Sequence, residues 1–198
     1  METIAKKLVL NPLSKTIPED YLRDNQTIET LVILEGFTEI GAGAFSGCTN
    51  LKRVHLPKSL KAIRDNAFDD CMNLKEIEIP ESLETIGDGA FAGCKSLPKI
   101  DIPNKVKNIG DYTFADCEKL EGIEIPNSVE AIGERAFAYC ESLLEIEIPN
   151  SVKTVDYGAF EDCTNLKEII IDNTEEYAKQ NWDNEWDTGC DANITYLR

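Results

Sequence analysis

A 23-residue repeat runs through most of the 198-residue chain and constrains its fold more than any other feature. Phenylalanine recurs at this interval, cysteine follows each phenylalanine by three residues, and leucine follows each cysteine by three more. The recurring positions are Phe45, Phe68, Phe91, Phe114, Phe137, Phe160, Cys48, Cys71, Cys94, Cys117, Cys140, Cys163, Leu51, Leu74, Leu97, Leu120, Leu143 and Leu166. A fixed period of this length is the signature of a solenoid, in which each unit forms one coil and stacks on its neighbours.

Each unit contains a short segment in which polar and apolar residues alternate, such as Glu76 to Ile79. This period of two is typical of a half-buried strand, and equivalent strands one coil apart stack in parallel. We therefore predict one parallel β-sheet of about nine strands along one side of the solenoid. Proline follows five of these segments and lacks the backbone donor that continued pairing needs. The glycine- and alanine-rich stretch 86–94 predicts a tight turn and a short helical or 3₁₀ piece on the opposite side.

The pattern weakens at both ends of the chain, although one solenoid domain over residues 1–198 accounts for all of it. Residues 35–172 form the regular repeats. Residues 1–34 continue the apolar spacing without cysteine and are predicted to be degenerate repeats or a cap. Residues 173–198 are predicted to form a C-terminal cap, because each open end of a stack needs a cover.

The predicted C-terminal cap contains a cluster of aromatic residues, Tyr177, Trp182 and Trp186. We interpret this cluster as a plug over the end of the core, with a binding site as the alternative. One repeat beyond Ile171 lies Ile194, which we expect to occupy the equivalent position in a last strand.

The repeat unit I-P-x-S-[LV]-x-x-I-G-x-x-A-F-x-x-C-x-x-L-x-x-I-x-I resembles the BspA-like leucine-rich repeat of bacterial proteins. The match is best over residues 79–171 and looser over 31–56, and the segment 175–182 is similar to the closing segment of that family. The resemblance implies an α/β, right-handed leucine-rich-repeat solenoid. It also implies a non-enzymatic binding role, often at a cell surface.

The net charge of −17 at pH 7 restricts the classes of partner. A field of this sign repels nucleic acid and anionic membranes and attracts cationic proteins. No apolar run is long enough to insert into a membrane, and a small-molecule substrate is not expected. Only Leu8 to Leu10 follow Lys6 and Lys7, which is too short for the core of a signal peptide. The chain as given therefore predicts a cytoplasmic location, and the family resemblance offers a secreted or cell-surface location as the alternative.

The six repeat cysteines are predicted to form a buried ladder of free thiols, because cysteine packs well as a small apolar side chain. They do not form the closely spaced pairs that metal sites need, so no metal or cofactor is expected. Side chains that point the same way from adjacent strands are also poorly placed for a disulfide. The state of Cys190, which lies outside the ladder, stays open.

An enzymatic role is not expected. His55 is the only histidine and is predicted to point outward, beside Lys52, Arg53 and Lys58, where no carboxylate orients it as a base. The glycine patterns of nucleotide-binding loops are absent from the sequence.

The outward positions of the predicted sheet carry acidic residues in register, which makes this face the candidate partner-binding site. Like charges on adjacent strands are unfavourable, so a row of them suggests a use. The candidate residues are Glu76, Glu78, Asp101, Glu124, Glu145 and Glu147. The predicted function is a protein–protein interaction module with a cationic partner. The alternatives are a face that only keeps the protein soluble, a weak calcium site, and an adhesin-type surface fragment that binds host matrix protein or carbohydrate.

Overall fold

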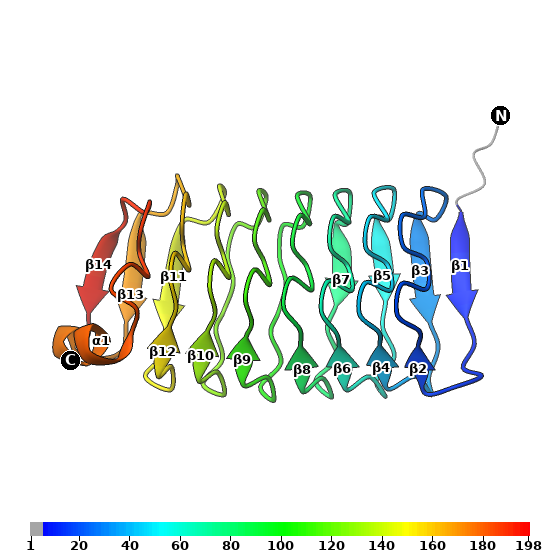
Figure 1. The fold of residues 1–198 in the computed structure, drawn as a ribbon, viewed down its shortest axis with the longest axis horizontal. Coiled ribbons are helices and arrows are strands. Elements are labelled where there is room, and N and C mark those ends of the chain that lie inside the picture. The colour runs from blue at the N-terminus through cyan, green and yellow to red at the C-terminus, as the bar shows by residue number, and fades with distance from the viewer. Residues whose placement is uncertain (1–5) are drawn as a thin grey trace.

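The structure, a computed structural model, describes residues 6–198 as parallel strands stacked in a β-solenoid of about eight turns. The coils follow one another along a single axis, with the N-terminus at one end and the C-terminus at the other (Figure 1). This confirms the predicted solenoid. The first five residues of the predicted N-terminal cap, residues 1–5, lie outside the described residues.

One side of each coil forms the strands that the alternating pattern predicts. A four-stranded parallel sheet contains β1 (Lys7–Leu10), β3 (Thr30–Ile33), β5 (Arg53–His55) and β7 (Glu76–Glu78). A three-stranded parallel sheet contains β11 (Glu145–Ile148), β13 (Glu168–Ile171) and β14 (Asn193–Tyr196). The register follows the repeat, since Val54 pairs with Ile77 and Leu8 with Leu31. We call the outward surface of these strands, and of the coils between them, the strand face.

The prediction of one continuous sheet is wrong in the middle of the solenoid. On this side of the solenoid, the two coils between β7 and β11 pair with each other only through an isolated bridge between Lys99 and Gly122. At the position of Pro98, the two preceding coils have Lys52 and Lys75, whose N–H groups donate to the previous coil at 2.8 and 2.9 Å. Pro98 has no N–H, and Gly122 provides no side chain to pack, so both residues weaken strand pairing here.

Replacing Pro98 by lysine is expected to slow hydrogen exchange of the backbone amides at positions 99–101. The new N–H would donate a hydrogen bond to the preceding coil, which stabilises the folded state by about 0.5–1.5 kcal/mol. Removing proline also increases the conformational entropy of the unfolded chain, which offsets a similar amount of free energy. The free energy of unfolding should therefore change by less than about 1 kcal/mol while local protection rises. The converse variant Lys75→Pro should break the pairing of β5 with β7. Unchanged exchange in Pro98→Lys would contradict this explanation of the gap.

A second row of short strands, which the sequence did not predict, lies along the lower edge of Figure 1. One sheet contains β2 (Thr16–Ile17), β4 (Glu39–Ile40), β6 (Ala62–Ile63) and β8 (Thr85–Ile86). The other contains β9 (Asn108–Ile109), β10 (Ala131–Ile132) and β12 (Thr154–Val155). Two residues are too few to show a clear alternation. The predicted tight turns are present on the remaining side, without 3₁₀ segments in residues 6–198.

The core contains a continuous stack of phenylalanine rings along the solenoid axis. Rings of adjacent coils, from Phe45 to Phe160, lie 5.4 to 5.8 Å apart and are almost parallel. The six repeat cysteines are buried beside them as free thiols. Each thiol from Cys71 onward donates a hydrogen bond to the carbonyl of the phenylalanine 26 residues earlier, as Cys117 does to Phe91 at 3.4 Å. The predicted buried ladder is confirmed, and each thiol also satisfies a carbonyl of the neighbouring coil.

The C-terminal end is covered by α1 (Glu175–Asn181) and two buried tryptophans. Trp186 meets Phe160 edge to face at 6.0 Å and Trp182 at 5.3 Å, which confirms the predicted plug. The expected register of the last strand is wrong, because Ile194 pairs with Ile169 and not with Ile171. This coil accommodates α1 and the tryptophans, and it returns to the sheet two residues later than a regular unit.

Candidate partner-binding surface

All six candidate acidic side chains are exposed on the strand face. Glu76 and Glu78 lie on β7, and Glu145 and Glu147 lie on β11. Asp101 and Glu124 lie on the two irregular coils between these strands. The apolar residues that alternate with them, such as Ile146, are buried, so the period of two decides which side chains face outward.

Two of the six carboxylates are neutralised by a neighbouring cation. Glu76 pairs with Arg53 on the adjacent strand at 2.9 Å, and Asp101 pairs with Lys99 at 2.9 Å. Glu78 lies opposite the exposed His55 in the register of β7 and β5. Within residues 6–198, the other four carboxylates form no ion pair with a lysine or arginine; they are Glu78, Glu124, Glu145 and Glu147.

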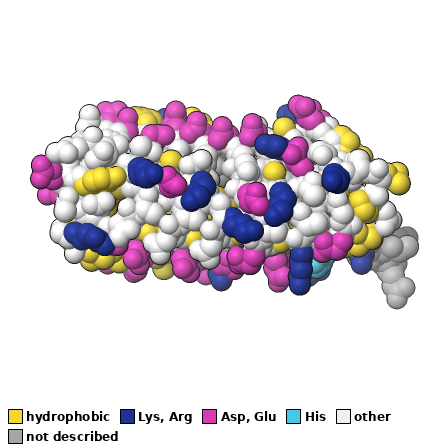
Figure 2. Space-filling view, turned by 90° about the horizontal axis from the view of Figure 1, so that it is seen from below, with side chains coloured by type: hydrophobic (Ala, Val, Ile, Leu, Met, Phe, Trp, Pro, Cys, Tyr) yellow, Lys and Arg dark blue, Asp and Glu magenta, His cyan; other side chains and the backbone are white. Residues whose placement is uncertain are grey.

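Charges beside the short strands are arranged differently, because basic and acidic side chains alternate from coil to coil. Lys61 pairs with Glu84 at 2.9 Å, and Glu130 lies between Lys107 and Lys153 and bonds to both. The hydrogen bond from Lys153 is the main cause that lowers the pKa of the Glu130 carboxyl. Figure 2, seen from the lower edge of Figure 1, shows Lys and Arg side chains along the middle of this side, with Asp and Glu between them and along its borders. Basic and acidic side chains therefore neutralise one another beside the short strands. Much of the strand face lacks this alternation of charge.

Shallow hollows accompany the unpaired carboxylates. One, of about 370 Å³, is lined by Glu124, Glu145 and Glu147 together with the coil at Ile123. An adjoining hollow of about 320 Å³ contains Asp101 and Gly122. A third, of about 500 Å³, lies over His55 and Glu78. A Cβ atom on Gly122 would meet no atom within 4 Å, so the absence of a side chain there leaves open space on the face.

Residues 6–198 hold no group of three or more His, Cys, Asp or Glu residues that could bind a metal ion. No helix in this range is long and apolar enough to cross a membrane.

The partial neutralisation of the site was not predicted from the sequence. The pairing of Lys99 with Asp101 and of Arg53 with Glu76 appears only in the structure. Lys99 was detectable, because a residue two positions away on a strand lies on the same face. The hollow at Gly122 was not detectable, since it depends on how far the neighbouring coils stand apart.

These features define a leucine-rich-repeat solenoid, a class of protein that is generally used for protein–protein interaction and is typically non-enzymatic. The chain belongs to the BspA-type leucine-rich repeat family, whose model matches six copies over residues 15–140 and 61–182. The resemblance read from the repeat unit is thus confirmed.

Solved structures agree with this assignment. A leucine-rich repeat protein of T. pallidum is 26% identical, with a TM-score of 0.75 over 98% of this chain and 87% of that one. The pneumococcal vaccine antigen PcpA shares the fold at 19% identity, with a TM-score of 0.60. The match covers 98% of this chain but only 42% of PcpA. No curated protein matches the chain significantly.

Proposed function

We propose that the chain is a non-enzymatic interaction module that binds a cationic segment of a partner protein through its strand face. The observation that carries this proposal is the set of four unpaired carboxylates, Glu78, Glu124, Glu145 and Glu147, on a surface whose register repeats every 23 residues. An extended chain with lysine or arginine side chains could meet several of them at once, as ligands of repeat proteins do.

The expected affinity is moderate and depends on salt. Each exposed ion pair contributes about 0.2–1 kcal/mol, so four together contribute about 1–4 kcal/mol. The hollows beside Glu124 and Glu78 could receive the aliphatic stems of lysine and arginine, which adds apolar contact. Because exposed charges are screened over about 8 Å at physiological ionic strength, binding should weaken steeply as salt is added.

The test measures binding of a labelled ten-residue peptide of alternating lysine and glycine by fluorescence anisotropy at low salt. A variant with glutamine at positions 78, 124, 145 and 147 should bind this peptide at least tenfold more weakly, because it loses the four unpaired charges. The fold should be unaffected, since these side chains are exposed.

The matched control replaces Glu84 and Glu130, which are already paired with lysines, by glutamine. This control makes the net charge two units less negative and should reduce binding far less than the quadruple variant. Normal binding by the quadruple variant at low salt would show that the acidic row only keeps the protein soluble.

A further inference from the structure

Three bulky side chains occupy backbone positions that favour glycine, and all three lie in two adjacent coils. Nine non-glycine residues in the described chain have positive φ, and six of them are aspartate or asparagine, which tolerate this conformation. The other three are Tyr112 (φ 56°), Arg135 (φ 49°) and Tyr139 (φ 60°). Tyrosine and arginine in this region are strained, because their Cβ atoms crowd the backbone at positive φ.

The repeat shows which residues would avoid this strain. Tyr112 and Arg135 occupy the turn position that is Gly43, Asn66 and Gly89 in earlier coils. Tyr139 occupies a second turn position, four residues further along the turn. There the other coils have glycine or aspartate, namely Gly47, Asp70, Gly93, Asp116 and Asp162. The bulky side chains are therefore a local departure from a pattern that the rest of the chain keeps.

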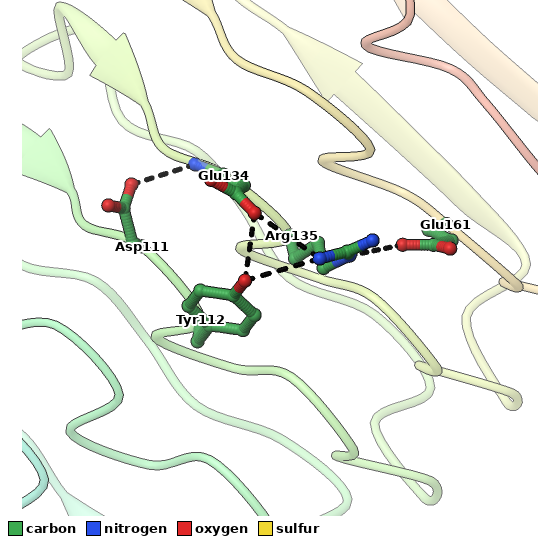
Figure 3. A network of polar contacts seen from close by, with 5 residues as sticks. All are labelled: Asp111, Tyr112, Glu134, Arg135 and Glu161. Carbon is green, nitrogen blue, oxygen red and sulfur yellow. Dashed lines mark hydrogen bonds and ion pairs between the residues drawn. The ribbon is translucent and has the colours of Figure 1, made fainter.

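Arg135 contacts side chains of the coil before it and the coil after it, including the ring-bearing Tyr112 (Figure 3). Its guanidinium pairs with Glu161 and lies 3.3 Å from the hydroxyl of Tyr112. That hydroxyl donates to Glu134 at 2.8 Å. The same guanidinium lies 5.1 Å from the ring centre of Tyr157. Side chains from three successive coils thus form one ordered cluster on the turn side of the solenoid.

The rings remain open to solvent, and the charges around them are mainly negative. Tyr112 and Tyr139 are each 40% exposed although they are large apolar side chains. The negative charges of Glu161 and then Asp162 raise the pKa of the Tyr139 phenol. Arg135 offsets only part of the charge of Glu134, Glu161 and Asp162. We call Tyr112, Arg135, Tyr139 and Tyr157 the tyrosine patch.

We propose that the tyrosine patch is a second docking surface, separate from the strand face, for an arginine-bearing segment of a partner protein. Arginine fits because its planar guanidinium stacks on an aromatic face and bonds to carboxylates at the same time, which lysine does less well. Tyrosine and arginine are also the residue types that dominate binding energy at protein interfaces. In this proposal, the unfavourable backbone conformation of Tyr112 and Tyr139 is kept because their exposed rings bind the partner.

The experiment uses two labelled ten-residue peptides, one alternating arginine with glycine and the other lysine with glycine. The double variant Tyr112→Asn and Tyr139→Asn introduces a residue type that tolerates positive φ, as Asn66 does at the first turn position, so its melting temperature should stay the same or rise. It should bind the arginine peptide at least fivefold more weakly than the original protein does. The variant Tyr112→Phe and Tyr139→Phe, which keeps the rings, should bind within about twofold of the original.

Two controls separate this surface from the strand face and from a general loss of tyrosine. Tyr21→Asn removes an exposed tyrosine near the N-terminal end and should leave binding unchanged. The glutamine variant at positions 78, 124, 145 and 147 should lose the lysine peptide and the share of arginine-peptide binding that the strand face provides. The arginine peptide should still bind this variant through the tyrosine patch, and adding Tyr112→Asn and Tyr139→Asn should remove that remaining binding. Unchanged binding of the arginine peptide by the Tyr112→Asn and Tyr139→Asn variant would overturn the proposal. A lower melting temperature of that variant would also overturn it, since the rings would then serve to hold the coils together.

Discussion

Replacing Phe114 by alanine is expected to lower the free energy of unfolding by about 3–5 kcal/mol. The ring is fully buried and lies 5.8 Å from the ring of Phe91 and 5.5 Å from that of Phe137. Its removal loses both contacts and leaves a cavity that the rigid neighbouring coils cannot fill. Equilibrium unfolding in urea, followed by circular dichroism, measures the change.

The matched control is Leu144→Ala, which truncates an apolar side chain that is 49% exposed. Its effect should stay within about 0.5 kcal/mol. In a stack of coils, loss of one interface also weakens coupling between the two halves, so the Phe114→Ala variant should show a broader transition. A loss below about 1 kcal/mol would show that the phenylalanine stack contributes little to stability.

Raising the pH above 9 is expected to destabilise the protein strongly through its buried thiols. Burial raises the pKa of the Cys117 and Cys163 thiols to about 12 and that of Cys48 to about 11. Thiols of the unfolded chain titrate near 9, so between pH 9 and 12 unfolding releases protons that the folded state retains. Stability due to these thiols is therefore complete below pH 9 and falls as the pH rises, by up to about 1.4 kcal/mol per pH unit for each thiol.

Urea unfolding at pH 7, 9 and 10 measures this dependence. Cys117→Ala removes one titrating group and should reduce the slope above pH 9 by about 1.4 kcal/mol per unit. At pH 8 the six ladder thiols should react with a thiol reagent only after unfolding, whereas the half-buried Cys190 should react first. Rapid labelling of several ladder thiols in the native protein, or stability independent of pH between 9 and 10, would contradict the buried ladder.

The repeat made most of the fold predictable. Residues at fixed intervals must reach equivalent positions in a stack, so the burial of Phe114 and Cys117 and the exposure of Glu78 and Glu147 follow from spacing and from the period of two. The same reasoning placed the acidic candidates on one face. It depends only on local geometry, which each coil repeats.

Other features depend on contacts between coils. The gap in the sheet is set by Pro98 and Gly122, whose effects are visible only against the hydrogen bonds of the neighbouring coils. The two-residue shift of the last strand reflects the room that α1 and the tryptophans take at the end of the core. The 23-residue spacing between equivalent positions predicts neither the gap in the sheet nor the shift of the last strand.

The sequence by itself determined the solenoid, its strand register over the regular repeats, the contents of its core and the face that carries the acidic row. The tertiary structure alone decided which acids keep a free charge, because Arg53 pairs with Glu76 while Glu145 meets no lysine or arginine among residues 6–198. It also decided that Tyr112, Arg135 and Glu161 meet across coils, with Tyr112 and Arg135 in a backbone conformation that is unfavourable for their residue types. The physical reason is the same in both cases. A repeat fixes the position of each Cα atom in its coil, but the ion pairs and contacts of a side chain depend on which side chains extend toward it from the neighbouring coils.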